Sequence, residues 1–394
     1  MSELEIFNWQ GLLTEHQVHT WRVIASSDGV SVKTLVAFSD LEQRTKQGWV
    51  QPNFNGLEII KLQHGFFGLC QGVRQVFNSP SRSIHCFSGF WGVRRYFLLM
   101  IFAQLSGRRT IVMQEPYAET EFGYLTDGRH IINKLKRLLR PLLYKLASRI
   151  CGSAIIRDRL KILAISPRAR VQLCSAGFPA DIIYPWAYFV PKITDNQLFK
   201  SVFNPLPEHK IRLIFVGTLL KIKGIRLLVE AFKLARIANP DILLDVFGHG
   251  DARTFEFETI NGIRFLGAIQ FGATQSVIRN YDILILPSLH DGWGVVVNEA
   301  LLQGVGVITS TDVGASCVVI AKNAGTTFKS GDMGGLADIL RGLNSDKIAT
   351  WKRGALAAAD SITPEVGGAF LISIVRAWDG RKFQSTYVPA PWLV

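Results

Sequence analysis

Short apolar runs that alternate with helical segments are the feature that most constrains the fold of this chain. In its second half, such runs are IRLIFVG, ILLDVFG, IRFLG, YDILILPS and VGVITS. The segments between several of them, such as GIRLLVEAFKLARIA and VVVNEALLQG, have the apolar spacing of helices. Apolar strands separated by helices predict a parallel sheet that is covered by helices on both faces. We therefore expect an α/β fold in this half.

The first half shows the same alternation less regularly. Its expected strands are LEIFNW, VKTLVAF, SIHCFSG, TIVMQEP, KILAIS and DIIYPWAYF. A polar segment that contains prolines separates the two halves. The expected architecture is two Rossmann-like domains that face a cleft, a usual place for a ligand. We expect a first domain at 1–191, a linker at 192–210, a second domain at 211–365, and a C-terminal helix or tail at 366–394 that can cross back to the first domain.

Composition narrows the partners and the compartment. The chain has 394 residues, 48% of them hydrophobic, and a formal net charge of +13, which favours an anionic partner. Its five cysteines are scattered without a CxxC pair or a Cys/His cluster, so we expect reduced thiols, a cytoplasmic protein and no metal site. No secretory signal is recognisable, and the longest apolar run, YFLLMIFAQL, is too short to span a bilayer.

Three loops of the second half follow expected strands and are rich in glycine. They are VGTLLKIKG, FGHGD and SLHDGWG. In open parallel sheets, ligands bind beyond the carboxyl ends of the strands. Gly294 immediately precedes a helix, whose free backbone amides can receive a phosphate group. Lys223, on a neighbouring loop, can add a full positive charge to such a site.

Two acids in this region have a spacing that suits a nucleotide sugar. Asp291 precedes the expected helix, and Glu299 lies inside it, with seven residues between them. The two carboxylates therefore bracket the predicted phosphate site. A nucleotide diphosphate sugar has ribose hydroxyls at one end and sugar hydroxyls at the other, and carboxylates are good acceptors for such hydroxyl groups.

The stretch PSLHDGWGVVVNEALLQGVGVITS, together with FVGTLLKIKG upstream, resembles the donor-binding signature of retaining family 4 glycosyltransferases. The resemblance covers roughly residues 211–316. Asp291 stands where the family has its first Glu, Trp293 stands where it has Phe, and Lys223 matches the family lysine. Thr218 is a departure, because the family usually has Arg at this position. Either Lys221 or an arginine of the first domain could supply the missing charge.

This resemblance implies the GT-B fold and a glycosyltransferase of the hexosyltransferase type. Such an enzyme moves a sugar, with retention of configuration, from a nucleotide diphosphate sugar to a glycan acceptor in polysaccharide or glycoconjugate biosynthesis. It implies no metal and no other cofactor. Asp291 and Lys223 are the expected catalytic residues, and Glu299 is expected to hold the ribose. The expected donor-binding set is Gly217, Thr218, Leu219, His249, Gly250, Gly292, Trp293, Gly294, Val295 and Glu299.

Three residues of the first half are expected at the cleft. Gly11 and His16 follow the first strand, and Glu115 ends the strand TIVMQ. They can contact the acceptor or the donor sugar. An ordinary helix start and a structural turn explain the same residues equally well.

A basic amphipathic helix is predicted from Arg129 to Ile150. At 100° per residue its leucines fall on one side, and the other side carries Lys134, Lys136, Arg137 and Arg140. One interpretation is attachment to the inner face of an anionic membrane, or binding of the diphosphate of a lipid-linked acceptor. The other is a helix packed on the core with a solvated basic face. Nucleic-acid binding is not expected, because no recognition motif accompanies the charge.

Two other functions fit the expected fold. A sugar-nucleotide epimerase would use the donor without an acceptor. A non-catalytic protein would bind the sugar nucleotide only, and Thr218 in place of Arg is the feature that favours it.

Overall fold

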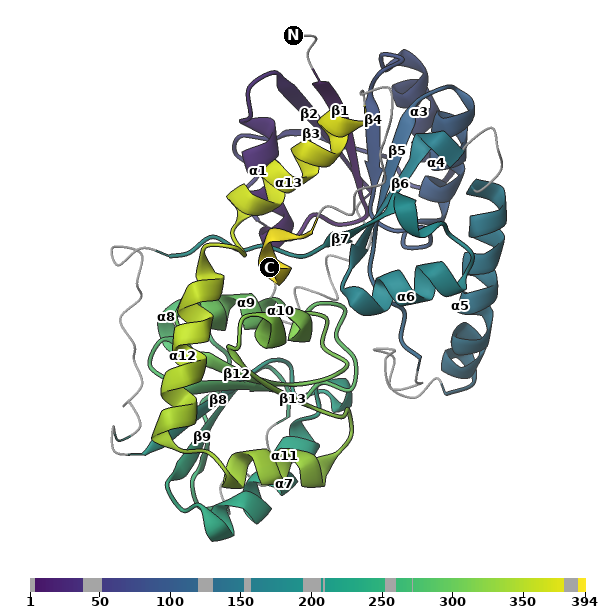
Figure 1. The fold of residues 1–394 in the computed structure, drawn as a ribbon. Coiled ribbons are helices and arrows are strands. Elements are labelled where there is room, and N and C mark those ends of the chain that lie inside the picture. Colours follow the sequence, from purple (N-terminus) through teal and green to yellow (C-terminus); the bar gives the residue numbers. More distant parts are fainter. Residues whose placement is uncertain are drawn as a thin grey trace.

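The structure is a computed structural model. It describes residues 4–37, 52–119, 130–151, 157–193, 207, 210–251, 260–270, 272–378 and 389–394. The chain forms two α/β domains, one above the other in Figure 1, each built on a parallel sheet. The expected two-domain α/β architecture is confirmed.

The sheet of the first domain has the strand order β3-β2-β1-β4-β5-β6-β7. Every pair of neighbouring strands is parallel. The strands are β1 (Leu4–Gln10), β2 (Val30–Val36), β3 (Glu58–Lys61), β4 (Ile84–Phe87), β5 (Arg109–Gln114), β6 (Leu160–Ile165) and β7 (Ile183–Trp186).

Helices cover both faces of this sheet. They are α1 (Glu15–Ala25), α3 (Gly65–Asn78), α4 (Arg94–Leu105), α5 (His130–Cys151) and α6 (Pro167–Ser175). Alternate residues of β1 face opposite sides, as a strand requires. Ile6 belongs to the core cluster that contains Trp21 of α1, whereas Phe7 belongs to the cluster that contains Tyr96 of α4.

The sheet of the second domain has the order β10-β9-β8-β11-β12-β13, also parallel throughout. Its strands are β8 (Ile211–Val216), β9 (Ile242–Phe247), β10 (Ile263–Phe265), β11 (Ile283–Leu286), β12 (Gly306–Ser310) and β13 (Gly325–Phe328). Its helices are α7 (Ile225–Ala238), α8 (Thr274–Ile278), α9 (Val295–Leu302), α10 (Ser316–Ala321), α11 (Met333–Arg341) and α12 (Ser345–Ala359). The expected elements of this half are present at the expected places.

The periodicity of the first half does not reveal β3, α3 or α6. β3 is a short edge strand with no fully buried residue, so it lacks the apolar run of a central strand. α6 is polar overall, with Ser166 at its N-cap and Pro167 in its first turn. The Ser-Pro pair is a signal for a helix start that could have located α6.

The C-terminal segments return to the first domain. Helix α13 (Pro364–Ala377) lies beside α1 in Figure 1, and the Arg376 guanidinium donates to the Asp28 carbonyl. Further on, the buried Trp392 packs edge-on against Trp186 and Phe189. The C-terminal segments therefore pack against the first domain, α13 against α1 and Trp392 against Trp186 and Phe189. Most of the expected linker at 192–210 lies outside the described residues, so its boundaries stay a prediction.

Helix α5 contacts the first domain through a narrow side that includes Tyr144, Ala147 and Cys151, all buried. Its leucines point away from the core, with Leu138 63% exposed and Leu142 59% exposed. The interpretation in which the leucine side packs on the core is therefore wrong for this helix. Helices α3 and α4 also carry exposed apolar side chains: Phe66, Phe67, Phe77, Leu98 and Leu105. Figure 1 shows α3, α4 and α5 on the same side of the first sheet.

Within the described part of the chain, no single helix has the length and apolar composition needed to cross a membrane. The bent pair α12 and α13 meets that criterion by length and composition only.

The packing of Trp392 gives a first prediction. Trp392→Ala should lower the free energy of unfolding by about 3–5 kcal/mol, because it removes a large buried side chain that packs against Trp186, Phe189 and Phe370. Ile237→Ala is the control, since this side chain is 85% exposed and its loss should change stability by less than about 0.5 kcal/mol. Chemical denaturation measures both. Equal effects would contradict the role assigned to the C-terminal segment.

Candidate site at the domain interface

Four loops gather at the carboxyl edge of the second sheet. They follow β8 (217–224), β9 (248–250), β11 (287–294) and β12 (311–316). Backbone hydrogen bonds join them: Leu219 N–H donates to the His249 carbonyl at 2.8 Å, and Leu289 N–H donates to the Ile222 carbonyl at 2.7 Å. The three loops singled out by their glycines are thus neighbours in space.

The loop after β12 completes this edge, although its sequence carries no obvious motif. The Asp291 N–H donates to the Asp312 carbonyl at 3.0 Å, and the Ala315 N–H donates to the Trp293 carbonyl at 2.8 Å. Asp291 and Val313 also form a parallel bridge. Two loops that are far apart in sequence therefore fix Asp291 and Asp312 side by side.

At two positions in these loops the backbone conformation and the close packing require glycine. Gly294, at the start of α9, has a φ of +87°, and a Cβ there would lie 2.8 Å from Val313 Cγ1. Gly224, at the start of α7, has a φ of +70°, and a Cβ there would lie 2.0 Å from the Pro287 carbonyl oxygen. Any other residue would clash and be strained, so these helix starts can be formed only with glycine.

The two expected catalytic residues contact each other directly. Lys223 Nζ donates to Asp291 Oδ2 at 2.6 Å, and both side chains are largely buried. The sequence predicts separate contacts, Lys223 with the diphosphate and Asp291 with the sugar. In the structure each neutralises the other, so a bound donor would meet a paired lysine and carboxylate.

Glu299 is the fifth residue of α9, and its carboxyl group, unlike that of Asp291, is not paired with a lysine. Among the described residues, no group forms a hydrogen bond or an ion pair with its carboxyl. The residue is half-buried, and desolvation by the surrounding protein raises its pKa to about 8. A carboxyl group in this state gains from ligand hydroxyls that donate to it.

Charged groups of both domains surround His290. Burial lowers the pKa of His290, and Arg168 and Lys223 act in the same direction, against Asp291 and Asp312. The imidazole is therefore neutral at physiological pH. Two cations and two carboxylates meet around it, so the cluster carries no net charge.

The first domain approaches the loop after β11 through Glu115. A Cβ on Gly292 would lie only 3.0 Å from the Glu115 carboxyl carbon. Tyr188 donates its hydroxyl to Glu115 Oε1 at 2.5 Å, and its ring lies 4.5 Å from that of His16. Of the three residues expected at the cleft, Glu115 thus lies against the donor loop, and His16 lies against Tyr188. Gly11 directly follows β1 at the carboxyl edge of the first sheet and donates its N–H to Ser88 Oγ.

A second contact between the domains passes through Asn298. Its amide nitrogen donates to the Tyr188 carbonyl at 2.8 Å, and its amide oxygen accepts from Trp293 Nε1 at 2.8 Å. Trp293 is only 2% exposed, and Leu219 is buried as well. These two expected donor-binding side chains are part of the core, which leaves their backbone atoms to contact a ligand.

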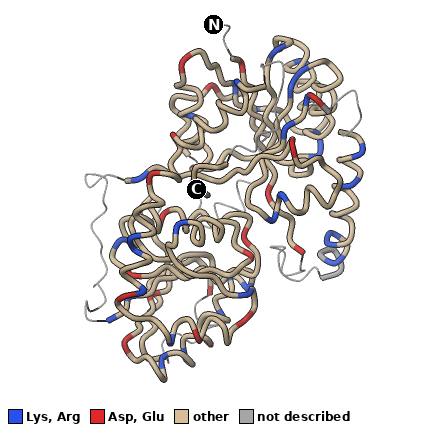
Figure 2. The backbone as a smooth tube through the Cα atoms, in the orientation of Figure 1, with Lys and Arg blue, Asp and Glu red and all other residues tan. Residues whose placement is uncertain are grey.

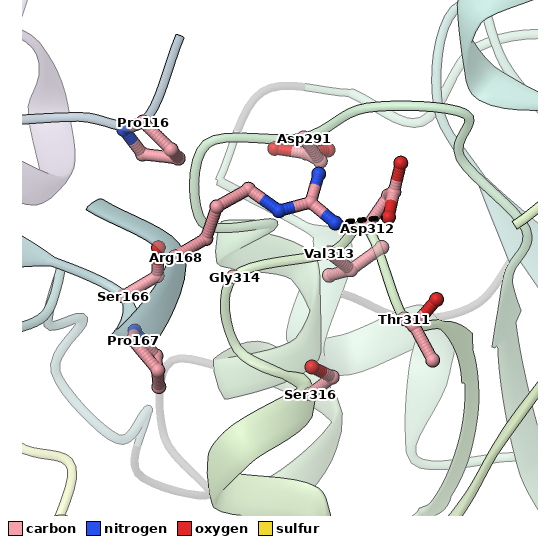
Figure 3. Close-up of a pocket in the computed structure, with 10 residues that line it drawn as sticks. All are labelled: Pro116, Ser166, Pro167, Arg168, Asp291, Thr311, Asp312, Val313, Gly314 and Ser316. Carbon is pink, nitrogen blue, oxygen red and sulfur yellow. Dashed lines mark hydrogen bonds and ion pairs between the residues drawn. The ribbon is translucent and has the colours of Figure 1, made fainter. Parts of the chain in front are cut away.

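A small pocket of about 80 Å³ lies between the domains. Arg168, at the start of α6, reaches across it and forms an ion pair with Asp312 (Figure 3). Burial opposes its charge, but the hydrogen bond and the attraction of Asp312 and Glu119 together raise the pKa of Arg168. The other lining residues are Pro116, Ser166, Pro167, Asp291, Thr311, Val313, Gly314 and Ser316.

The structure thus brings together the expected residues of the second domain. Gly217, Thr218, Leu219, Lys223, His249 and Gly250 lie on the first two loops, and Asp291, Gly292, Trp293, Gly294, Val295 and Glu299 lie on the loop after β11 and on α9. Sequence reasoning missed Arg168, Tyr188 and Asp312. Asp312 follows the strand VGVITS, and this position at a strand end was an available signal.

The described residues contain no group of three or more His, Cys, Asp or Glu side chains that could hold a metal ion.

Known proteins resemble this chain in sequence and in fold. Residues 196–355 match the family model of glycosyl transferases group 1. This match covers less than half of the chain, and it spans most of the second domain. A relative is the D-inositol 3-phosphate glycosyltransferase of Arthrobacter, 24% identical over 221 residues, which are 52% of each chain. The chain spans between 38% and 52% of the length of the first curated relatives that it matches.

Solved structures of glycosyltransferases share the whole fold. A glycosyltransferase from Rickettsia africae has a TM-score of 0.69 at 12% identity, covering 97% of this chain and all of the other. The Anabaena protein Alr3699/HepE in complex with UDP has a TM-score of 0.64 at 15% identity, covering 95% of this chain and all of the other. The chain therefore has the GT-B fold.

The raised pKa of Glu299 gives a second prediction. Its ordinary value is 4.5, so between this value and about 8 the folded protein holds a proton that the unfolded chain has released. The unfolding free energy of the wild type should therefore fall as the pH rises from about 5 to 8, relative to Glu299→Gln, by up to about 1.4 kcal/mol per pH unit. Denaturation at several pH values measures this difference. Glu230→Gln, at an exposed position of α7, should keep the wild-type slope. Parallel profiles for wild type and Glu299→Gln would refute the effect.

Proposed function

We propose that this protein is a retaining glycosyltransferase of family 4. It transfers a sugar from a nucleotide diphosphate sugar to a lipid-linked glycan acceptor. The reaction belongs to polysaccharide or glycoconjugate biosynthesis. The observation that carries the proposal is the arrangement at the start of α9. A lysine–carboxylate pair, Lys223 and Asp291, lies before the helix, and the unpartnered carboxyl of Glu299 lies within it. The UDP complex of Alr3699/HepE supports a nucleotide donor.

The proposed chemistry needs no metal. The amides at the start of α9 and Lys223 bind the diphosphate, where negative charge grows as the bond to the sugar breaks. Asp291 accepts hydroxyls of the sugar, and Glu299 accepts hydroxyls of the ribose. The acceptor oxygen forms a bond to the anomeric carbon while the bond from that carbon to the phosphate oxygen breaks. The acceptor proton passes to the departing phosphate oxygen.

A panel of UDP, GDP and ADP sugars tests the donor. Thermal shift should identify one nucleotide that stabilises the wild type, and Glu299→Ala should weaken its binding by about 1.5–3 kcal/mol. Release of nucleotide with incorporation of labelled sugar into a glycan would support transfer. Turnover of the donor with no acceptor requirement would favour an epimerase, and binding without turnover would favour a non-catalytic protein.

A third prediction concerns the leaving diphosphate. Lys223→Ala should lower turnover more than donor affinity, because its charge interacts more strongly with the phosphate as the bond breaks. Lys233→Ala is the control, since Lys233 is an exposed lysine of α7 that pairs with Glu230 and is not part of the expected donor site. Steady-state kinetics with the nucleotide sugar found above measure both variants. Loss of affinity with unchanged turnover would contradict the assignment.

We also propose that the first domain lies on the inner face of an anionic membrane. The support is the combination of exposed leucines with lysines and arginines on α5, and of exposed phenylalanines on α3. Helix α5 has no acidic residue, and Figure 2 shows Lys and Arg along it. Such a surface combines apolar insertion with attraction to anionic lipids. A lipid-linked acceptor would then reach the cleft from this side.

The membrane proposal yields a fourth prediction. Replacing Lys134, Lys136, Arg137 and Arg140 with Gln should release the protein from anionic vesicles, since each basic residue contributes about 1 kcal/mol at low salt. The control variant removes the same number of positive charges from the second domain and should still bind the vesicles. It replaces with Gln the residues Lys233, Arg341, Lys347 and Arg353. Co-sedimentation at low and high salt measures both. Identical sedimentation of all three proteins would count against the membrane surface, and the acceptor would then be sought among soluble glycans.

A further inference from the structure

The pocket between α6 and the loop after β12 shares one residue, Asp291, with the expected donor site. The other expected donor residues of the second domain, including Lys223, Gly294 and Glu299, do not line it. It therefore lies beside the position expected for the transferred sugar, on the side closed by the first domain. We propose that this pocket is the subsite for hydroxyl groups of the acceptor sugar, a proposal that rests on the function proposed above.

Ser166 is the observation that points to a ligand. It is only 4% exposed and lines the pocket, and its hydroxyl has no hydrogen-bond partner among the residues that the structure describes. A serine at the N-cap ordinarily accepts from an amide of its own helix, and here it does not. Its φ of +87° is unusual for a residue other than glycine. A buried hydroxyl without a partner is rare, so a group that enters the pocket would satisfy it.

The charges in the pocket select a neutral polyol over an anion. The positive charge of Arg168 is balanced by Asp312, and that of Lys223 by Asp291. A phosphate would meet two carboxylates, whereas a sugar hydroxyl can donate to a carboxylate and accept from the guanidinium. Thr311 and Ser316 add hydroxyl groups on the second-domain wall (Figure 3). The small volume admits an edge of a sugar ring and leaves the rest of the glycan in the open cleft.

Both domains contribute residues to this subsite, so that an acceptor sugar can contact both of them at once. Ser166 and Arg168 come from the first domain, and Asp291 and Asp312 come from the second. The Arg168–Asp312 ion pair holds the two walls together. A sugar that bridges the guanidinium and the carboxylate would make contacts only while the domains are in this arrangement.

The test measures glycan binding and nucleotide binding separately. Saturation-transfer NMR with the methyl glycosides of glucose, galactose, mannose and N-acetylglucosamine is run on the wild type, with and without the nucleotide identified in the donor panel. At least one glycoside should bind. Arg168→Gln should weaken that binding by about 10-fold to 100-fold, and Ser166→Ala by about 3-fold to 10-fold, as expected for the loss of a charged and a neutral hydrogen bond. Val171→Ala, an exposed position on the same helix, should change nothing.

The affinity for the nucleotide identified in the donor panel, and hydrolysis of its sugar without an acceptor, complete the test. Both should stay within about twofold of the wild type in Ser166→Ala, because this hydroxyl acts on the acceptor side only. Equal loss of acceptor-independent hydrolysis would assign the pocket to the donor sugar and overturn the proposal. Glycoside binding that is absent in the wild type, or unchanged in both variants, would also overturn it. Failure of the proposed function would differ, because the wild type would then bind no nucleotide in the donor panel. Arg168→Lys, which keeps the charge, and thermal unfolding of each variant separate loss of the subsite from loss of the fold.

Discussion

Backbone hydrogen bonds among the loops at the carboxyl edge of the second sheet are the interaction on which the site depends. They join Leu219 to His249, Leu289 to Ile222 and Asp291 to Asp312. Each of these loops would be too short to hold a side chain precisely by itself. Because parallel strands end at the same edge, their loops can satisfy one another's backbone groups and become rigid together. Lys223 and Asp291 then meet at 2.6 Å, although they are 68 residues apart in the chain.

Balanced charge is the second property of the site. Two ion pairs, one within the second domain and one across the interface, compensate four charges near a neutral imidazole. Glu299 stands apart, because no cation pairs with it among the described residues and desolvation raises its pKa to about 8. Carboxyl groups whose pKa is shifted in this way occur preferentially at functional sites. The contrast between the compensated pairs and the isolated Glu299 therefore indicates a ligand contact at Glu299 more directly than the motif spacing alone.

The outer surface of the first domain has a different character from its interior. Apolar residues of α1 and α4 are buried against the sheet, whereas the leucines of α5 and the phenylalanines of α3 are exposed. Periodicity identifies the apolar side of an amphipathic helix but does not say whether that side faces the core. Helix α5 shows the difference, since a narrow side around Tyr144 and Ala147 makes the contact with the domain.

The sequence by itself determined the strand–helix alternation, the two α/β domains and the loops of the second domain that meet at one edge. These features depend on local patterns: apolar runs form strands, and glycines such as Gly224 and Gly294 permit helix starts that other residues would block. Only the tertiary structure decided which side chains meet. It paired Lys223 with Asp291, directed Trp293 into the core, and brought Arg168 and Tyr188 from the first domain to the second. Contacts between domains leave no periodic trace in a sequence, because they depend on how two separately folded surfaces fit together.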